Sequence, residues 1–163
     1  MSHYGGGQRN KAELDFALLL DDVIWSSFRQ DVFEHWDIAG VLRDVTAESY
    51  RYDVKGMRRN ARAGRIDPDI TWVESKNVRG RPGCVYGKAD YIAFEQPETW
   101  VIVDRTRLVG FMRDKIADNG SALVEHAKDA LYRLYSRKNR SDVISKALMA
   151  DIRDIARWEV AKA

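Results

Sequence analysis

The sequence predicts a mixed α/β (α+β) domain in which a central mixed β-sheet is flanked by helices. Three observations predict this class: short apolar runs of β type, amphipathic helical patterns toward both ends, and a length of 163 residues, which suits one hydrophobic core. Hydrophobic residues make up 45% and charged residues 32%, a balance typical of folded globular proteins. We therefore expect a flexible N-terminus over residues 1–10 and a single domain over 11–163.

The first part of the chain begins with a helical pattern and continues as strands. Over residues 11–33 we expect one amphipathic helix, because apolar side chains recur at helical spacing at Phe16, Leu20, Ile24 and Phe28. Gly, Asp and Pro then separate a series of β-like runs, as turns would. The expected strands span residues 35–42, 50–57, 70–78, 90–94 and 99–103. The sequence EQPE joins the last two as a hairpin connection.

The second part of the chain returns to helical patterns. Residues 106–117 and part of 121–132 have helical spacing, interrupted at Asp118-Asn119-Gly120. Two short strands are indicated around the basic turn RKNR, by Tyr132 with Leu134 and by Val143 with Ile144. A last helix is expected over residues 150–157.

Composition excludes several kinds of site. No run approaches the roughly 18 apolar residues that cross a bilayer, and the N-terminus lacks the apolar core of a secretion signal, so we expect a cytoplasmic protein without a membrane partner. Cys84 is the only cysteine, which excludes an internal disulfide and a thiolate zinc site. The three histidines have no helical metal-ligand spacing. Any metal would be held by carboxylates, which favours Mg²⁺ or Mn²⁺.

Basic residues are clustered although the formal net charge is only +2. The clusters lie in residues 56–65, 77–83 and 135–141. Each could neutralise phosphates, or could be a solvated loop. Net charge alone therefore does not indicate a nucleic-acid partner.

The candidate chemistry lies in two of the expected strands. Alternate side chains share a face of a strand, so Asp53 and Lys55 project together, opposite Val54. The preceding strand supplies Asp37, and neighbouring strands would let the two carboxylates converge on one cation. Phosphodiester hydrolysis needs a metal that activates water and a positive group that stabilises the transition state. Asp37 and Asp53 are thus the candidate metal ligands, and Lys55 the electrostatic or water-orienting group.

A structural role for the same acids is the alternative. An isolated D-x-K pattern is short, and strand acids often pair with arginines, here Arg43 or Arg51. Both acids, however, lie in β-like runs with bulky apolar neighbours, where an uncompensated charge is costly. This placement favours a functional site.

The arrangement resembles the signature of the PD-(D/E)XK nucleases, with Asp37 as first acid and Asp53-Val54-Lys55 as the tripeptide. Trp36 stands where that signature has proline. The runs DVKGMRR and TWVESKNVRGRPGCVYGKADYIAFE also resemble small phage-encoded nuclease-like proteins, so that the likeness covers residues 37–103.

The resemblance implies a restriction-endonuclease-like core and a Mg²⁺- or Mn²⁺-dependent DNA endonuclease (a hydrolase) in phage or prokaryotic DNA processing. A phage-encoded protein would act in the cytoplasm of the host cell. Because many such phage proteins have no assigned role, the alternative is a non-catalytic nucleic-acid-binding or phage accessory protein that retains the nuclease fold. Small nucleases that cut both strands often pair, so a homodimer is compatible with this function, although the sequence carries no interface signature.

Other acids leave the assignment of the tripeptide open. Glu74-Ser75-Lys76 is a second E-x-K, and the Asp53 tripeptide is preferred because its helix-strand-strand order fits the resemblance better. Glu74 then becomes a third acid among the catalytic candidates, or a partner for the arginine cluster. Glu13 could face the site from the first helix, or serve as an N-terminal charge that the helix dipole favours.

DNA is the expected partner, contacted through its backbone by basic residues close to the site. The candidates are Arg58, Arg59, Arg62 and Lys76. The glycine-rich run GRPGCVYGKADYIAFE has neither of the common phosphate-loop spacings, so we expect no nucleotide cofactor. Its Gly80, Gly83 and Gly87 are expected to permit tight turns before a buried strand.

Overall fold

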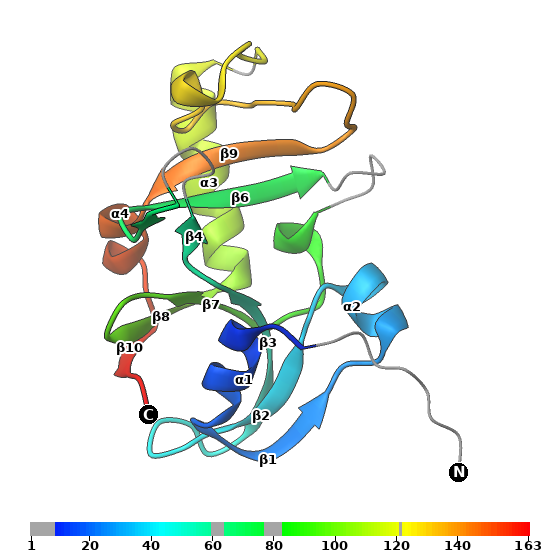
Figure 1. The fold of residues 1–163 in the computed structure, drawn as a ribbon, viewed down its shortest axis with the longest axis vertical. Helices are drawn as coiled ribbons and strands as arrows, with labels where there is room; N and C mark the ends of the chain where they lie inside the picture. Colours follow the sequence, from blue (N-terminus) through cyan, green and yellow to red (C-terminus); the bar gives the residue numbers. More distant parts are fainter. Residues whose placement is uncertain (1–8, 60–63, 77–82, 121) are drawn as a thin grey trace.

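A curled six-stranded mixed sheet forms the centre of the computed structural model, which describes residues 9–59, 64–76, 83–120 and 122–163 (Figure 1). Its strands are, in spatial order, β1 (Leu20–Trp25), β2 (Ile38–Leu42), β3 (Ser49–Lys55), β7 (Tyr91–Glu95), β8 (Thr99–Asp104) and β10 (Trp158–Ala161). All neighbours are antiparallel except β3 and β7, which are parallel. A mixed sheet flanked by helices was expected and is confirmed.

Helices cover the two faces of this sheet. On one face α1 (Lys11–Ala17) buries Phe16, whose ring lies 5.1 Å from that of Tyr52 and 5.0 Å from that of Trp100. On the other face α3 (Arg105–Asn119) buries Leu108 and Met112 in a second apolar cluster. The sheet therefore separates two cores, and a side chain on β3 belongs to one or the other according to its register.

Between β3 and β7 the chain leaves the main sheet. It forms β4 (Arg58–Arg59), β5 (Ile66–Asp67), β6 (Ile70–Lys76) and the 3₁₀ turn η1 (Cys84–Tyr86). The strand β6 pairs antiparallel with β9 (Val143–Leu148), and this two-stranded ladder lies beside α3, apart from the main sheet (Figure 1). The short helix α4 (Met149–Asp154) follows β9 and leads to β10.

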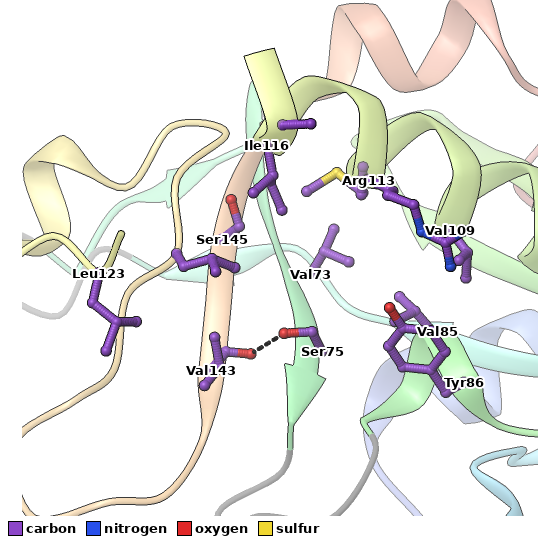
Figure 2. Close-up of a pocket in the computed structure, with 13 residues that line it drawn as sticks. Val73, Ser75, Val85, Tyr86, Val109, Arg113, Ile116, Leu123, Val143 and Ser145 are labelled. Carbon is purple, nitrogen blue, oxygen red and sulfur yellow. Dashed lines mark hydrogen bonds between the residues drawn. The ribbon is translucent and has the colours of Figure 1, made fainter. Parts of the chain in front are cut away.

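The face of the ladder toward α3 borders a cavity of about 580 Å³, here called the apolar cavity (Figure 2). Its lining is mostly hydrophobic and consists of Val73, Ser75, Val85, Tyr86, Val109, Met112, Arg113, Ile116, Ala117, Leu123, Leu134, Val143 and Ser145. Because side chains alternate along a strand, the opposite face of β6 presents Trp72 and Glu74. The ladder thus has one apolar and one polar side.

The expectation of a single helix over residues 11–33 is wrong. The helix α1 ends at Ala17, β1 follows, and α2 (Phe28–Glu34) begins after a Ser27 capping box. Ile24 is 61% exposed and Phe28 is 75% exposed, so the apolar stripe is buried only as far as Leu20. Pairing of β1 with β2 at the sheet edge outweighs the helical pattern of the sequence.

Most of the other expected elements are present with shifted ends. The strands expected over residues 50–57, 70–78, 90–94 and 99–103 correspond to β3, β6, β7 and β8, and the helix over 106–117 corresponds to α3. The strand expected over 35–42 starts only at Ile38, because His35 has a left-handed conformation that ends α2.

The C-terminal part of the chain departs further from expectation. The helix expected within residues 121–132 is wrong, since the described residues there form no α-helix and their one helical element is the 3₁₀ turn η2 (Ala127–Asp129). The first of the two short strands is reduced to isolated bridges at Leu131 and Tyr135, whereas the second is the longer β9. The last helix ends at Asp154, and β10 was not expected at all.

Two further expectations concern the chain ends and the membrane. The flexible N-terminus was expected over residues 1–10, of which 1–8 lie outside the described residues. Among the described helices, none has the length and apolar character needed to cross a bilayer.

Candidate functional site

Asp53 and Lys55 share the face of β3 that points away from α1. Tyr52 and Val54 belong to the core under α1, so the alternation of the strand directs Asp53 and Lys55 to the opposite face. The Lys55 ammonium lies 2.8 Å from Oδ1 of Asp53. The expectation that these two side chains project together is confirmed.

Asp37 immediately precedes β2 and continues the contact between β2 and β3 by one residue. The last paired residues are Ile38 and Tyr52. The Asp37 N–H donates to the Tyr52 carbonyl at 2.9 Å, and the Asp37 carboxylate accepts the Val54 N–H through Oδ2 at 2.7 Å. The carboxylate therefore takes the place of a backbone acceptor, and this bond holds it against the strand that carries Asp53.

The two acids are buried and interact electrostatically. Asp37 is 8% exposed and Asp53 is 4% exposed. Burial and the charge of Asp53 raise the pKa of Asp37 to about 8, against the opposing effects of the Val54 N–H and Lys55. Burial alone would lower the pKa of Lys55, but the charge of Asp53 and its contact with the ammonium raise it, so the amine stays protonated.

One oxygen of this cluster has no partner among the described residues. Oδ2 of Asp53 is buried and accepts no hydrogen bond. A buried carboxylate oxygen without a donor is costly, and a cation would satisfy it while relieving the repulsion between Asp37 and Asp53.

The donor set fits a hard divalent ion. Mg²⁺ is commonly held by one or two carboxylates, with water and substrate phosphate completing its six ligands. No group of three or more His, Cys, Asp or Glu side chains is arranged to hold a metal within the described part of the chain. Asp37 and Asp53 could thus hold such an ion only together with water or a phosphate.

The arginines named as alternative partners bind elsewhere. Arg43 donates to Asp21 at 2.8 Å. Arg51 lies over the ring of Trp36, 5.6 Å from its centroid. Among the described contacts, neither arginine forms an ion pair with Asp37 or Asp53. The structure therefore does not support the alternative in which Arg43 or Arg51 neutralises the two acids.

Glu74 approaches the same cluster from β6. Burial raises its pKa, Asp142 and Asp53 raise it further, and Lys55 and His35 oppose the shift. Glu74 and Lys55 line one cavity, as expected for a third acid in the cleft. Of the arginines close in sequence to Glu74, Arg79 and Arg81 lie outside the described residues, as does Gly80, whereas Arg58 lines the same cavity as Glu74.

Close packing of η1 against β6 brings Cys84 into this cluster. A side chain at Gly83 would meet the Glu74 carbonyl oxygen at 2.4 Å, so only glycine allows the approach. A side chain at Gly87 would likewise meet the Glu34 carbonyl oxygen, at 2.6 Å. Burial raises the pKa of the Cys84 thiol to about 11, which keeps it protonated and argues against a nucleophilic role.

Lys55 also borders a cavity of about 430 Å³, here called the polar cavity. Its lining combines cations and aromatic rings: Lys55, Arg58, Trp72, Glu74, Cys84, Ala127, Tyr135, Arg137 and Ile144. Sequence reasoning did not assign Trp72, Tyr135 or Arg137 to a site. The only signal was the basic cluster at 135–141, which by itself could not be placed beside β3.

The predicted DNA-contacting residues are only partly described. Arg58 lines the polar cavity. Arg59 and Lys76 have a described backbone, in β4 and β6, but not a described side chain, and Arg62 lies outside the described residues. Their expected role therefore stays a prediction.

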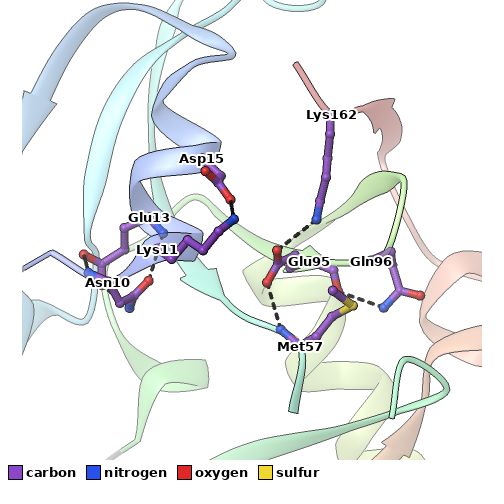
Figure 3. A network of polar contacts seen from close by, with 8 residues as sticks. All are labelled: Asn10, Lys11, Glu13, Asp15, Met57, Glu95, Gln96 and Lys162. Carbon is purple, nitrogen blue, oxygen red and sulfur yellow. Dashed lines mark hydrogen bonds and ion pairs between the residues drawn. The ribbon is translucent and has the colours of Figure 1, made fainter. Parts of the chain in front are cut away.

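Glu13 forms part of the N-terminal cap of α1 (Figure 3). The Asn10 side chain accepts the Glu13 N–H at 2.9 Å, and the Glu13 carboxylate accepts the Asn10 N–H at 3.3 Å. Burial raises the pKa of Glu13, and the charges of Asp31 and Asp53 add to the shift, against Asn10 and Arg9. Glu13 thus caps the helix and also lies within electrostatic reach of the site.

Glu95 fixes the segment that leads from Lys55 to Arg58 (Figure 3). Its carboxylate accepts the Met57 N–H at 3.1 Å and a hydrogen bond from the Lys162 ammonium at 2.9 Å. This contact ties the exit from β3 to β7 and to the C-terminus, so that Arg58 has a defined position beside the polar cavity.

Comparison with known proteins adds no assignment. No protein-family model, curated protein or solved structure matches this chain.

Proposed function

We propose that this protein is a Mg²⁺- or Mn²⁺-dependent DNA endonuclease in which Asp37 and Asp53 hold the ion and Lys55 assists hydrolysis. The observation that carries the proposal is the arrangement of two buried carboxylates from neighbouring β-structure beside one ammonium group. The unpartnered oxygen of Asp53 and the raised pKa of Asp37 are the features that a cation would relieve.

The chemistry divides between the ion and the protein. A bound divalent ion would polarise the phosphate and lower the pKa of a water molecule. The Lys55 ammonium, held at 2.8 Å from Asp53, would stabilise negative charge that develops on the phosphate. Asp53 positions the Lys55 ammonium through their direct ion pair, and Asp37 is held beside the same strand by the Val54 N–H.

The order of elements supports a restriction-endonuclease-like core as part of the proposal. The elements run in the order α1, β1, α2, β2 and β3, with the first acid immediately before β2 and the tripeptide on β3. A mixed sheet with helices on both faces surrounds these residues (Figure 1). Both features agree with the resemblance drawn from the sequence.

Nicking of supercoiled plasmid tests the proposal. Asp53→Asn should reduce cleavage in Mg²⁺ or Mn²⁺ on the order of 100-fold or more, because it removes a ligand charge without changing side-chain size. Asp44→Asn is the matched control, since Asp44 is exposed and its positive φ of 61° suits asparagine. An Asp53→Asn protein that cuts as fast as the wild type would end the proposal.

A non-catalytic nucleic-acid-binding or accessory protein is the second candidate. The observation that favours it is that, within the described residues, no group of three or more His, Cys, Asp or Glu side chains is arranged to hold a metal. Calorimetric titration with Mn²⁺ separates the candidates. The enzyme should give binding heat that disappears in Asp37→Asn, whereas the second candidate should give no such heat and should bind DNA in EDTA.

A further inference from the structure

We propose that the polar cavity receives one unpaired nucleotide of a DNA strand, with its phosphate between Arg58 and Arg137 and its base against the ring of Tyr135. This inference rests on the proposed function and specifies its substrate as DNA with an unpaired segment.

The charges around the cavity favour an anion. Lys55, Arg58 and Arg137 line it, against the single acid Glu74. Lys55 is paired with Asp53, and Arg137 is paired with the fully buried Asp142 through a 2.8 Å hydrogen bond from Nε. Arg58 forms no ion pair within the described part of the chain.

Arg58 and Arg137 are close enough to affect each other. Burial lowers the pKa of Arg58, and the positive charge of Arg137 lowers it further against the attraction of Asp67. The Arg137 side chain remains 41% exposed despite its pair with Asp142. A phosphate placed between the two guanidinium groups would offset their mutual repulsion. The planar guanidinium groups could bind it through several hydrogen bonds at once.

The aromatic rings provide a surface for a base. Trp72 and Tyr135 have centroids 6.0 Å apart and planes tilted by 36°. Arg58 lies over Trp72 at 4.5 Å and Lys146 at 5.4 Å, whereas the described residues place no cation over Tyr135. Tyr135 is therefore the ring on which a base can stack, since every nucleobase has a π-face.

The size of the cavity is compatible with one unpaired nucleotide. Its volume of about 430 Å³ suits one small ligand, within the range of roughly 300–1,000 Å³ for such pockets. A base in a duplex must unstack and unpair before it can reach a ring inside a cavity, and both steps cost free energy. An unpaired base avoids the cost of breaking a base pair. Lys55 borders both the cavity and the carboxylates, so a nucleotide bound there lies next to the proposed cleavage site.

Fluorescence anisotropy in EDTA measures this binding without cleavage. The probes are labelled ten-nucleotide oligothymidine and a blunt DNA hairpin, titrated with the full chain. Wild type should bind oligothymidine at least tenfold more tightly than the hairpin. Tyr135→Leu and Arg58→Gln should each weaken oligothymidine binding about tenfold, as loss of a stacking ring or a phosphate contact does.

Matched variants complete the test. Tyr86→Leu removes a tyrosine from the apolar cavity, and Arg107→Gln removes an exposed arginine of α3. Both should bind oligothymidine as the wild type does. Equal losses in Arg107→Gln and Arg58→Gln, or no loss in Tyr135→Leu, would overturn the inference.

The two proposals fail in different experiments. Plasmid cleavage lost in Asp53→Asn, together with unchanged binding by Tyr135→Leu, would leave the endonuclease and remove the nucleotide pocket. Tight oligothymidine binding that depends on Tyr135, in a protein that never cuts DNA, would leave the pocket and remove the endonuclease.

Discussion

The two sides of the β6–β9 ladder differ in chemistry although they are built from neighbouring residues. Trp72 and Glu74 face the polar cavity, whereas Val73 and Ser75 face the apolar cavity (Figure 2). On β9, Ile144 borders the first cavity and Val143 the second. One short ladder therefore separates a surface suited to charged ligands from a surface that packs against α3.

The comparison indicates that the apolar side of the ladder serves mainly stability, whereas the polar side adjoins the proposed functional site. The apolar side contributes burial, which no change of pH between 6 and 9 alters, because its core side chains do not titrate. The polar side joins the Asp37, Asp53 and Lys55 cluster, where burial and charge oppose each other. Substitutions on the two sides should thus differ both in the size of their effects and in the pH dependence of those effects.

The largest expected effect is on the apolar side. Met112→Ala should lower the free energy of unfolding by about 3 kcal/mol, because Met112 is 5% exposed and its loss leaves a larger void. Urea denaturation at pH 6 and pH 8 should give the same loss. Leu123→Ala is the control: Leu123 borders the same cavity but is 59% exposed, so its loss should stay within about 0.5 kcal/mol. A Met112→Ala loss that changes with pH would break the comparison.

The next effect is on the polar side and depends on pH. The pKa of Asp37 is about 8 in the folded protein and near 3.8 when unfolded, so the folded state binds more protons between these values. Without divalent ions, wild-type stability should fall as pH rises through this window. Asp37→Asn keeps an acceptor for Val54 but cannot ionise. Its stability relative to wild type should therefore rise by at least about 1 kcal/mol from pH 6 to pH 8.

Urea denaturation in EDTA at the two pH values measures this change. Asp44→Asn again serves as control, because Asp44 is exposed and lies in a turn. If the difference in free energy of unfolding between Asp37→Asn and the wild type were the same at pH 6 and pH 8, Asp37 would already be ionised at pH 6.

The smallest effect is expected at Glu74. Burial raises its pKa, so the charged form is disfavoured in the folded state and wild-type stability falls as pH rises above the unfolded pKa. Glu74→Gln should stabilise the protein by less than about 1 kcal/mol at pH 7 and should have no effect at pH 3, where the acid is protonated. Thermal unfolding would measure this change in stability, with Glu48→Gln as the control because Glu48 is exposed. If Glu74→Gln were less stable than the wild type at pH 7, the charged Glu74 carboxylate would instead make a stabilising interaction that glutamine cannot replace.

Local patterns predicted the centre of the candidate site. The alternation of β3 was sufficient to place Asp53 beside Lys55, since a strand has a fixed period of two. The short connection between β2 and β3 made them antiparallel neighbours, which brought Asp37 to the same place. Its hydrogen bond to the Val54 N–H was not foreseen, because a side chain that replaces a backbone acceptor leaves no sequence pattern.

Long-range contacts account for what the sequence did not predict. Trp72 and Tyr135 are far apart in sequence and meet because β6 pairs with β9 and Tyr135 bridges to Ile144 of β9. The edge strand β1 was interpreted as helix, because its apolar residues happened to follow helical spacing. In both cases tertiary pairing decides the outcome, and local propensity is a weak guide to it.

The bond between the Asp37 carboxylate and the Val54 N–H makes one backbone proton sensitive to what the site contains. If a cation draws that carboxylate away from β3, the Val54 amide loses its acceptor and exchanges faster with deuterated solvent. If Oδ2 keeps the bond while the other oxygen binds the ion, exchange slows as the site becomes more rigid. The exchange rate of this single amide would thus act as a gauge of metal occupancy, readable without substrate.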